Sequence, residues 1–565
     1  MSKIVIVGGV AGGASAATRL RRLSEEDEII MFERGPNVSF SNCSLPYHLS
    51  GMIENANSLV MMNPEAFQTR YHIDARVNQE VVEINRTNKM IRVHNLMTEE
   101  IYEETYDKLI LSPGAKPIKP KIKGIESANV FTIRNVEDIV HVKQGIMNAG
   151  HKNVAVIGGG YIGIETAENL VNGGYQVTLI EAQNQVLKTF DYDMVQIFHR
   201  ELYIKGVKLI LEDKVSEFNK QTIMLASGRT VEAEAVIMAI GIAPETTLAK
   251  EAGLEIGSTG AIKVNSNYQT NDESIYAIGD AIELTHGVTQ REARISLAGP
   301  ALKQARIVAN HIHGRKTENI KYLGSSAIRV FDYNGAATGL NENLIKELGL
   351  DVNYEAIQFI LNDKVGLMPD AHPLFFKLLY EKETGKILGA QAIGKGNVDK
   401  RIDVIATAMK FGATVDDLSE LDLCYAPPFG TAKDIINYAG HIGQNLMNED
   451  FRQVSVDKLR SLIENNAYIL DVREVMEYKN GHIIGAVNIP LSSLRDRVEE
   501  IPKDKDVYIH CRTGQRSYNA VMALQHLGYH NVINVTGGFL GFSFYEFFDD
   551  IRLNREKVVT DYNFR

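Results

Sequence analysis

Two cysteines, Cys43 and Cys511, stand in sequence contexts that suit sulfur chemistry. With Cys424 they are the three cysteines of the 565-residue chain, and none has a second cysteine at a metal-binding or disulfide spacing. No metal site is therefore predicted, and each thiol is considered alone. A lone thiolate cannot form a disulfide with a neighbour, so its oxidised form is a mixed disulfide with a small thiol or a sulfenic acid.

The surroundings of these two cysteines predict a stabilised sulfur anion at each. Cys43 lies in the polar segment SFSNCSLPYHLSG, which we expect to favour the reactive thiolate. Cys511 follows the apolar run VYIH and precedes a short loop and a helical stretch, SYNAVMALQHLGY. A cysteine between a strand and a helix N-terminus lies in an anion-stabilising position, and loop N–H groups can form a nest around its sulfur. Arg512 and Arg516 are expected to add fixed positive charge.

Two strand–turn–helix units must position a nucleotide. They are KIVIVGGVAGGASAATRLRRL, followed by EIIMFER, and NVAVIGGGYIGIETAENLVNGG, followed by QVTLIEA. Their glycines allow a tight turn and close helix–strand contact, so that the helix N-terminus meets a pyrophosphate. The first unit has Val10 where the middle glycine would stand. The glycines assigned to this role are Gly8, Gly9, Gly12 and Gly13 in the first unit, and Gly158, Gly160 and Gly163 in the second.

An acidic residue ends the strand after each helix, Glu33 in the first unit and Glu181 in the second. Such a carboxylate accepts hydrogen bonds from a ribose 2′-hydroxyl and repels a 2′-phosphate. Glu181 therefore favours NADH over NADPH.

The bulk composition excludes some partners. Lys and Arg total 60 against 71 Asp and Glu, for a formal net charge of −11, which argues against nucleic acid or an anionic membrane as the main partner. No window of about 20 residues is apolar and uncharged, as a membrane-spanning helix requires. The N-terminus runs directly into the first strand and lacks the marks of a signal peptide, so a cytoplasmic location is expected.

The two nucleotide units, together with TNDESIYAIGDA, resemble the two-dinucleotide-binding flavoprotein disulfide reductases over about residues 1–445. The resemblance implies FAD, with Asp280 binding the ribityl chain, NADH at the second unit, and a homodimer. The segments LILSPGAKP and VIMAIGIAPET resemble the two connections between the domains of that superfamily. It assigns to cofactor binding Arg34, Ser112, Pro113, Gly114, Gly241, Gly279 and Asp280.

The single cysteine of SFSNCSLPY resembles the branch that contains coenzyme A disulfide reductases, NADH oxidases and NADH peroxidases. By that resemblance, Tyr425 acts near the active cysteine of the partner subunit, while Leu367 and Met368 replace a tyrosine pair of the coenzyme A enzymes. This replacement favours a smaller sulfur substrate over coenzyme A disulfide. The positions that match coenzyme A contacts are Ser15, Arg19, Arg22, Ser39 and Asn42. Arg19 and Arg22 share a helix face and suit phosphates, although they would also complement a helix C-terminus.

The C-terminal segments DVRE, GHIIGAVNIPL and VYIHCRTGQRS resemble a single-domain rhodanese over about residues 452–555. The resemblance implies that Cys511 carries sulfur as a persulfide, held by a loop that contains Arg512, Gly514 and Arg516. The run GHIIGAVNIP is expected to be structural.

The expected fold class is α/β, with two Rossmann-like dinucleotide-binding domains for FAD and NADH, an α+β dimerisation domain and a C-terminal α/β rhodanese domain. The expected boundaries are 1–149 and 266–322 for the FAD domain, 150–265 for the NADH domain, 323–446 for dimerisation, 447–455 for a linker and 456–565 for the rhodanese domain.

The function predicted is a FAD- and NADH-dependent reductase that cleaves the sulfur–sulfur bond of persulfides or polysulfides, coenzyme A persulfide included, at Cys43, and releases hydrogen sulfide. Cys511 would transfer sulfur. Coenzyme A is expected to bind, as substrate or as a mixed disulfide. Three alternatives stay open: a coenzyme A disulfide reductase, an NADH oxidase or peroxidase, and a non-reductive sulfur carrier.

Overall fold

The computed structural model describes residues 1–148, 150–317 and 320–564, and it has the mixed α/β fold that the sequence predicts. Contacts divide the chain into two compact units. Unit 1 contains Met1–Asn184 and Ile210–Gly324, and unit 2 contains Gln185–Leu209 and Ser325–Arg565. The segment Gln185–Leu209 lies in sequence between the two parts of unit 1, but its contacts place it in unit 2.

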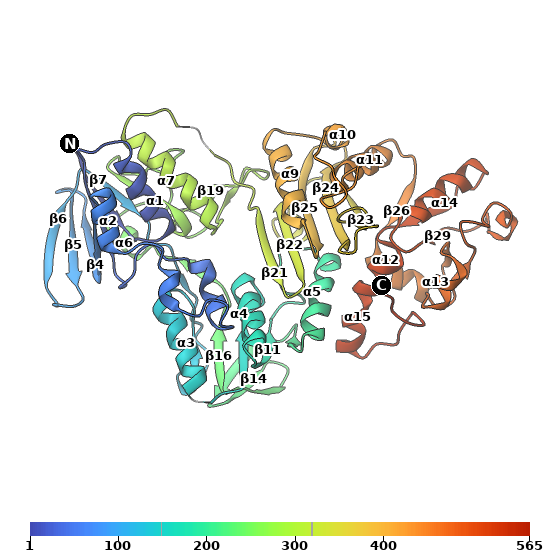
Figure 1. Ribbon diagram of the computed structural model, residues 1–565, viewed down its shortest axis with the longest axis horizontal. Helices are drawn as coiled ribbons and strands as arrows, with labels where there is room; N and C mark the ends of the chain where they lie inside the picture. Colours follow the sequence, from blue (N-terminus) through green and yellow to red (C-terminus); the bar gives the residue numbers. More distant parts are fainter. Residues whose placement is uncertain (149, 318–319, 565) are drawn as a thin grey trace. The chain divides into compact units, whose positions relative to one another are not determined.

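The first sheet of unit 1 is parallel and begins with the N-terminal strand (Figure 1). Its order is β18-β7-β1-β2-β3, with β1 Lys3–Val7, β2 Glu28–Glu33, β3 Asp74–Val77, β7 Lys108–Leu111 and β18 Ile275–Ala277. The central residues of β1 are fully buried, as a sheet covered on both faces requires. Helices α1 (Ala11–Arg21) and α7 (Ala298–Ile312) pack against each other beside this sheet.

The second nucleotide unit repeats this arrangement. Strands β11-β10-β16-β9 are parallel neighbours, with β9 Val130–Phe131, β10 Asn153–Ile157, β11 Gln176–Ile180 and β16 Ala235–Met238. Helices α3 (Val136–Asn148) and α4 (Tyr161–Asn172) accompany them. A two-stranded antiparallel ladder joins β8 (Ala115–Pro117) to β17 (Ile242–Pro244). It connects the loops that follow β7 and β16, and so holds the two nucleotide units of unit 1 together.

Smaller elements complete unit 1. The segment that carries Cys43 is a short 3-10 helix, η1 (Asn42–His48). The others are η2 (Ala56–Leu59), α2 (Pro64–Tyr71), β4 (Gln79–Asn85), β5 (Met90–Asn95), β6 (Ile101–Thr105), η3 (Ile125–Ser127), β12 (Lys208–Ile210), β13 (Val215–Asn219), β14 (Thr222–Leu225), β15 (Thr230–Glu232), α6 (Thr247–Glu251), η4 (Gly279–Ala281), β19 (Leu284–Thr285) and β20 (Glu292–Ala293). Of these, β12 is the strand at which the chain returns from unit 2.

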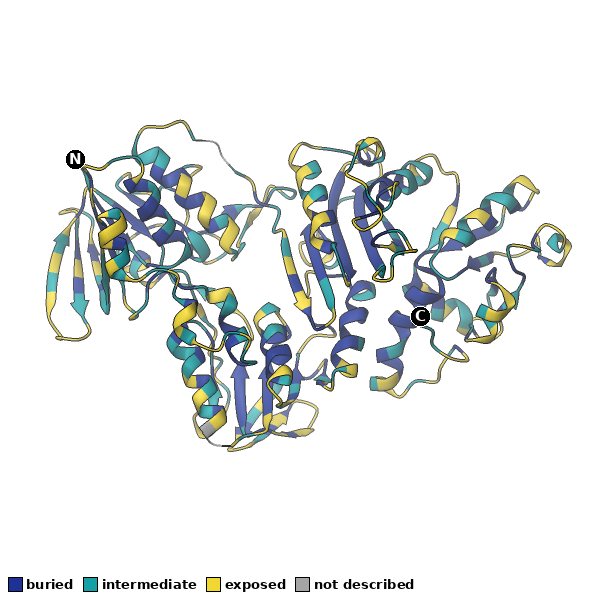
Figure 2. Ribbon diagram, viewed as in Figure 1, coloured by how far each residue is buried: buried dark blue, intermediate teal, exposed yellow. Residues whose placement is uncertain are grey.

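Unit 2 begins with an antiparallel sheet in the order β21-β22-β25-β24-β23. The strands are β21 Ser326–Val330, β22 Tyr333–Gly339, β23 Tyr354–Asn362, β24 Pro373–Glu381 and β25 Ile387–Gly394. Every residue of β25 is buried, and Figure 2 shows these strands as a buried layer beside helices with exposed outer faces. The helices are α8 (Glu342–Glu347), α9 (Val398–Lys410), α10 (Val415–Glu420) and α11 (Ile435–Met447).

The C-terminal part of unit 2 has a parallel sheet in the order β26-β30-β29-β27-β28. The strands are β26 Arg452–Val454, β27 Tyr468–Asp471, β28 Val487–Asn488, β29 Val507–His510 and β30 Val532–Val535. Its helices are α12 (Val456–Glu464), α13 (Val475–Lys479), η5 (Val498–Glu500), α14 (Gln515–His526) and α15 (Gly538–Leu553). Cys511 follows β29, and α14 begins four residues later, as the sequence predicts.

Helix α5 (Tyr192–Ile204) ties the C-terminal part of unit 2 to the antiparallel sheet. It packs on α15, where the Tyr192 hydroxyl donates to Asp549 at 2.6 Å. The guanidinium of Arg200 lies over the ring of Phe564 at 3.7 Å and faces Phe544 at 5.3 Å. On its other side the segment is held by Lys377 of β24, whose Nζ lies 2.9 Å from Asp193. The C-terminal domain is therefore packed against its neighbours within unit 2.

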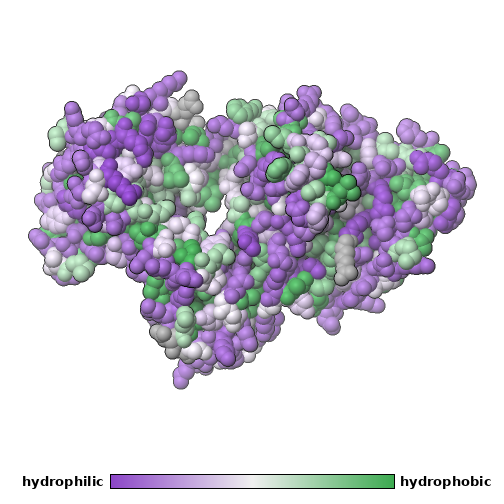
Figure 3. Space-filling model, in the orientation of Figure 1, coloured by the Kyte–Doolittle hydropathy of each residue, from purple (hydrophilic) through white to green (hydrophobic). Residues whose placement is uncertain are grey.

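The visible face of the molecule is mostly hydrophilic, with hydrophobic residues in small separate groups (Figure 3). Among the helices of the described residues, none has the length and apolar character needed to cross a membrane.

Candidate active sites

The turn after β1 has the geometry of a phosphate cradle. Gly8 has a φ of +98°, and a Cβ placed on it would lie 2.1 Å from the carbonyl oxygen of Ser112. A Cβ on Gly13 would lie 1.8 Å from the carbonyl oxygen of Gly8, so helix α1 and the turn approach as closely as two backbones can. No side chain caps the start of α1 at Val10. Its first N–H groups are thus available to an anion.

The second turn, after β10, is built in the same way. Gly158 has a φ of +107°, and a Cβ on Gly163 would lie 1.9 Å from the carbonyl oxygen of Gly158. Around Gly160, which precedes α4 without a side-chain cap, no described atom lies within 4 Å of an added Cβ. This open space before a helix N-terminus suits a pyrophosphate.

The two acidic residues have matching hydrogen bonds. Glu33 accepts from the N–H groups of Gly9 at 2.9 Å and Gly35 at 3.0 Å. Glu181 accepts from the N–H groups of Gly159 at 2.7 Å and Gln183 at 2.8 Å. Each carboxylate is fixed at the end of its strand, with lone pairs left over for a ribose diol. Nothing in the sequence signals these backbone contacts.

A cavity of about 370 Å³ opens beside the first unit. It is lined by Ala115, Ile242, Pro244, Asp280, Arg294 and Ser296. Burial raises the pKa of the Asp280 carboxyl. A cavity with an apolar side, formed by Ala115, Ile242 and Pro244, and a polar side that includes a buried acid suits the ring and ribityl chain of a flavin. The cradle at Gly8, the fixed Glu33 and this cavity together fit FAD.

The remaining residues assigned to cofactor binding border these turns, with one exception. Ser112, Pro113 and Gly114 follow β7, Gly241 follows β16 with a φ of +123°, and Gly279 begins η4 with a φ of +77°. The exception is Arg34, whose Nη1 lies 3.8 Å from Glu80. Its side chain is 44% exposed. The binding roles of this group stay predictions.

Cys43 lies near the N-terminal end of η1 and is exposed. Its Sγ lies 3.9 Å from Oδ1 of Asn42, and Ser41 and Ser44 bond to each other instead of to the sulfur. Partial desolvation and the charges of Glu165 and Asp280 raise the pKa of the Cys43 thiol. In the protein alone the polar segment therefore does not favour the thiolate, because burial and two negative charges oppose its ionisation and the hydroxyls of Ser41 and Ser44 bond to each other. The expectation that a nearby flavin favours the thiolate stays a prediction.

Glu165, on helix α4 of the second nucleotide unit, is a site residue that the sequence did not reveal. Burial and the neighbouring Glu168 raise the pKa of its carboxyl to about 7. A carboxyl with this pKa changes its charge near neutral pH, close to a thiol whose ionisation it opposes. The only advance signal is its place four residues after the first helical residue, Tyr161, which is too weak to single it out.

The segment around Cys43 is held from two helices of the same unit. Lys143 of α3 donates to the carbonyl oxygen of His48 at 2.7 Å. Ser50 donates to Oδ1 of Asn169 on α4 at 2.7 Å. Ser39, just before η1, has a left-handed φ of +50°, which a non-glycine residue adopts only at some cost in strain. The cysteine is thus placed by packing, while its sulfur is left open.

The two arginines assigned to coenzyme A belong to a larger basic cluster on α1, on α7 and at the C-terminal ends of both helices. Arg19 donates to Oδ1 of Asn310 at 2.8 Å. Desolvation, together with the positive charges of Arg306, Arg315 and Arg22, lowers the pKa of Arg19. Three positive charges thus act on Arg19, which suits an anionic ligand, and binding of coenzyme A phosphates at this cluster stays a prediction. Ser15 lies one turn earlier on α1, while Ser39 and Asn42 flank Ser41 ahead of Cys43.

Tyr425, the remaining predicted catalytic residue, lies in unit 2 in the segment between α10 and α11, and its side chain is 49% exposed. Leu367, which stands where relatives of the resembled branch have a tyrosine, is 92% exposed. Both side chains are open to contact with another chain.

Cys511 is held very differently, in a cradle at the end of β29. It is only 1% exposed, and its Sγ accepts from the N–H of Gly514 at 3.2 Å and from the hydroxyl of Ser517 at 3.6 Å. Gly514 has a φ of +105°, which turns the loop so that its N–H faces the sulfur. The start of α15 fixes the loop from behind, since Phe539 N–H donates to the Cys511 carbonyl oxygen at 2.8 Å. One loop N–H and one hydroxyl thus lie at the sulfur, and a nest of several N–H groups around it stays a prediction.

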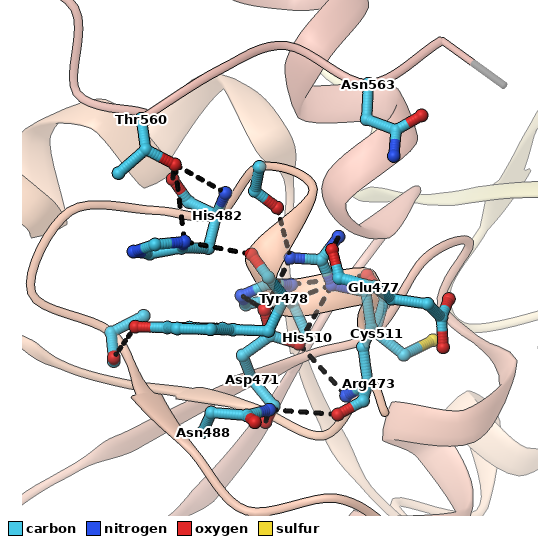
Figure 4. Close-up of polar contacts among 12 residues, drawn as sticks. Asp471, Arg473, Glu477, Tyr478, His482, Asn488, His510, Cys511, Thr560 and Asn563 are labelled. Atoms are coloured by element: carbon cyan, nitrogen blue, oxygen red, sulfur yellow. Dashed lines mark hydrogen bonds and ion pairs between the residues drawn. The ribbon is translucent and has the colours of Figure 1, made fainter. Parts of the chain in front are cut away.

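Buried charged residues support the Cys511 loop (Figure 4). Asp471 and Arg473 form an ion pair at 2.6 Å, and both are almost fully buried. His510 Nε2 lies 3.6 Å from Asp471, and burial lowers the pKa of His510, so its ring stays neutral. These residues orient the loop and leave the sulfur as the group that reacts.

The charge of the loop differs from the expectation at one arginine. Arg516 makes a two-bond ion pair with Glu477, at 2.6 and 2.7 Å. The expectation that both arginines add positive charge is therefore wrong for Arg516, because Glu477 neutralises it. Glu477 and Ser517 were missed by sequence reasoning. Glu477 lies 39 positions before Arg516, and no local pattern links them.

Comparison with known proteins gives three family matches. The chain matches "Pyridine nucleotide-disulphide oxidoreductase" over residues 2–305, the dimerisation domain of the same family over residues 325–434, and "Rhodanese-like domain" over residues 455–544. It is 35% identical to "Coenzyme A disulfide reductase" of Staphylococcus epidermidis over 445 residues, which are 79% of this chain and 100% of that protein.

Two solved structures are similar over nearly the full length. Reduced Bacillus anthracis CoADR-RHD is 47% identical, with a TM-score of 0.93, and the match covers 96% of this chain and 98% of that one. A NAD-dependent persulfide reductase from A. fulgidus is 34% identical, with a TM-score of 0.90, and the match covers 96% and 99% of the two chains.

Proposed function

The chain belongs to the pyridine nucleotide-disulphide oxidoreductase family, as a flavoprotein enzyme with a C-terminal rhodanese-like domain, and from this premise we propose its reaction. We propose that it uses NADH to reduce the sulfur–sulfur bond of a persulfide or polysulfide at Cys43, and that Cys511 transfers sulfur. The observation that carries the proposal is the solitude of Cys43, the single cysteine of unit 1, beside a cavity that fits FAD. Its oxidised partner must come from outside that unit.

The chemistry balances without a second protein thiol. Bound FAD would take a hydride from NADH and supply two electrons to the sulfur at Cys43. The Cys43 thiolate attacks the inner sulfur of a persulfide RSSH, forms a Cys43–S–S–R bond and expels HS⁻. Two electrons and two protons then restore the Cys43 thiol and release RSH. Overall, NADH, a proton and RSSH give NAD⁺, RSH and H₂S.

The side chains near Cys43 have defined tasks in this scheme. Because burial and the charges of Glu165 and Asp280 raise the pKa of the Cys43 thiol, the bound flavin is proposed to favour its thiolate. Glu165 can hold or release a proton near neutral pH, which suits the proton uptake of the reductive step. Tyr425 of a second subunit is proposed to protonate the leaving thiolate. The dimerisation domain supports a homodimer in which this is possible.

Coenzyme A is the proposed carrier of the sulfur substrate. The cluster of Arg19, Arg22, Arg306 and Arg315 supplies the positive charge that its phosphates require. Ser15, Ser39 and Asn42 would add hydrogen bonds, and Glu181 favours NADH as the electron donor. The name of the staphylococcal relative supports coenzyme A, and that of the A. fulgidus structure supports a persulfide.

Reduction of coenzyme A disulfide is the second candidate, favoured by the relatives that bear that name. The exposed Leu367 weighs against it, because this side chain offers no hydroxyl where the resembled enzymes have a tyrosine. A coenzyme A persulfide carries one coenzyme A group, whereas the disulfide carries two. The persulfide therefore needs less space and fewer contacts in the site.

The test is NADH consumption with coenzyme A persulfide, an inorganic polysulfide and coenzyme A disulfide. Cys43→Ser is expected to lose at least ~10³-fold of the activity with all three, because the nucleophile is gone. Cys424→Ser, which changes an exposed cysteine outside the proposed machinery, is the matched control and should retain activity. Undiminished turnover in Cys43→Ser would overturn the proposal. Faster turnover of the disulfide than of the persulfide would favour the second candidate.

A further inference from the structure

The charges around the Cys511 loop cancel. Three arginines, Arg473, Arg512 and Arg516, face three carboxylates, Asp471, Glu474 and Glu477. Arg473 is paired with Asp471, and Arg516 is paired with Glu477. The formal charges of these six side chains sum to zero, but only two of the three arginines are in ion pairs.

Arg512 differs from its neighbours because it has no such partner. Within the described parts of the chain, its side chain makes no ion pair or hydrogen bond. Burial, with the positive charges of Arg473 and Arg516, lowers the pKa of its guanidinium, while Glu477 acts in the opposite sense. The loop therefore offers to a substrate anion one cation that is in no ion pair, in addition to the N–H of Gly514.

Glu477 neutralises the charge of Arg516. Both of its carboxylate oxygens are taken by Arg516, and Oε2 also accepts from the backbone N–H of Glu474 at 3.2 Å. The Arg516 guanidinium is close enough to Cys511 to be influenced by the charge of its sulfur. Figure 4 shows the carboxylate of Glu477 on the same side as the Cys511 sulfur. An anion that approaches Arg516 thus also meets the carboxylate of Glu477, whereas the pair of Asp471 and Arg473 is buried.

We propose that Glu477 is a specificity-determining residue for sulfur transfer at Cys511, which excludes dianionic sulfur donors and leaves the loop to donors with at most one negative charge at the reacting sulfur. The inference rests on the proposed sulfur transfer at Cys511 and names the substrate class of that site. Persulfides of small thiols belong to the accepted class. Thiosulfate, the simplest dianionic donor, belongs to the excluded one.

The two reactions differ in charge, although both transfer one neutral sulfur atom. With a persulfide, the Cys511 thiolate attacks the outer sulfur of RSSH, a Cys511–S–SH group forms, and RS⁻ leaves with the electron pair of the broken bond. With thiosulfate, the thiolate attacks the sulfane sulfur, Cys511–S–S⁻ forms, and sulfite leaves as a dianion. The second reaction gathers three negative charges in the loop, and the first gathers one. A single unpaired arginine is matched to the first.

The experiment compares Glu477→Gln with the full-length wild type. Glutamine keeps an acceptor for the Glu474 N–H, so the start of α13 is preserved, while Arg516 regains its charge. Sulfur uptake on the peptide that carries Cys511 is followed by mass spectrometry with thiosulfate and with coenzyme A persulfide. We expect the thiosulfate rate to rise about tenfold and the persulfide rate to change less than about threefold. Added salt should shrink the gain, because it screens charges.

Two further variants separate charge from structure. Glu500→Gln removes a carboxylate from another two-bond pair of the same domain, the one with Arg497, and should leave both rates unchanged. The double variant Glu477→Gln/Arg516→Gln restores the wild-type net charge and should return the thiosulfate rate to near the wild-type value.

An unchanged ratio of the two rates in Glu477→Gln, or an equal gain in Glu500→Gln, would overturn the inference and leave the proposed sulfur transfer intact. Absence of sulfur uptake at Cys511 from either donor in the wild type would instead overturn the proposed transfer, and the inference with it.

Discussion

The surroundings of Cys43 and Cys511 show two ways to prepare a sulfur atom for reaction. Cys511 is buried and receives two hydrogen bonds from a loop that the fold fixes from both sides. Cys43 is exposed, has one distant amide oxygen near its sulfur, and faces carboxylates that oppose its ionisation. The described groups around the first sulfur all come from the polypeptide, while at the second we expect a bound group to govern reactivity.

This difference follows from what each site must do. A loop that only passes sulfur along performs no net oxidation, so a fixed set of N–H groups is enough to stabilise its anion. A thiol that is oxidised and reduced in each cycle must exchange electrons with a cofactor, and its ionisation is best governed by that partner. We expect the two sites to respond to mutation in opposite ways.

The largest expected effect that would test this comparison is on the backbone of the Cys511 loop. At Gly514, with a φ of +105°, an alanine that kept this conformation would cost about 1–3 kcal/mol in folding free energy, and we expect the loop to relax from it, which moves the N–H away from the sulfur. Sulfur transfer at Cys511 should fall by about 10²-fold. The measurement is sulfur uptake at Cys511, with the unfolding free energy determined in urea.

Gly528→Ala is the control for strain, because Gly528 also has a positive φ, of +86°, at the end of α14, with no described atom within 4 Å of an added Cβ. It should lose similar stability and keep its transfer rate. Equal losses of transfer in both variants would mean that Gly514 matters only for folding. NADH-dependent reduction at Cys43 should be unaffected by either.

A smaller effect is expected from the side-chain donor of the same cradle. Ser517→Ala removes a hydroxyl that lies 3.6 Å from the Cys511 sulfur and 3.0 Å from the carbonyl oxygen of Gly514, and it keeps the N–H of Gly514 as a donor. Because hydrogen bonds to charged groups contribute more than neutral ones, the transfer rate should fall about fivefold to tenfold. Ser517→Cys, which keeps a weak donor, should fall less, and a rate equal to wild type in the alanine variant would show that the loop N–H groups suffice.

The smallest expected effect is at the other site, on the ionisation of Cys43. Glu165→Gln removes a negative charge that opposes ionisation of Cys43, so the pKa of the Cys43 thiol should fall. The sign is fixed because Glu165, with a pKa of about 7, is ionised in the alkaline range where the thiol titrates. The alkylation rate of Cys43 plotted against pH should shift to lower pH by less than about one unit.

Glu168→Gln provides the contrast, since Glu168 raises the pKa of Glu165 and is not among the groups that act on Cys43. It should leave the alkylation profile in place. A profile that moves to higher pH in Glu165→Gln would contradict the electrostatic account of this site.

Sequence reasoning found the parts of the molecule that repeat a local pattern. The glycines of both turns, the acidic strand ends and the strand–loop–helix around Cys511 each follow from a backbone requirement that only certain residues satisfy. The fold class was confirmed for the same reason. Such local backbone requirements involve residues that are close together in the sequence, so a sequence pattern can reveal them.

What sequence reasoning missed depends on residues far apart in the chain. Glu165 reaches Cys43 from another nucleotide unit, and Glu477 reaches Arg516 from another strand connection. The polar residues around Cys43 suggested a stabilised thiolate, yet Ser41 and Ser44 satisfy each other. Side-chain partners and the sign of a local field are decided by tertiary packing, which no spacing rule records.

Helix α5 has a consequence for how such a protein arises and how it can be engineered. Its aromatic and charged contacts with α15 and Phe564 mean that a gene shortened before the rhodanese domain would leave Tyr192 and Arg200 facing water without partners. The fusion is thus no longer a pair of interchangeable modules joined by a linker. A working two-gene version of this enzyme would need compensating changes in α5, in a stretch of sequence that contains neither cysteine.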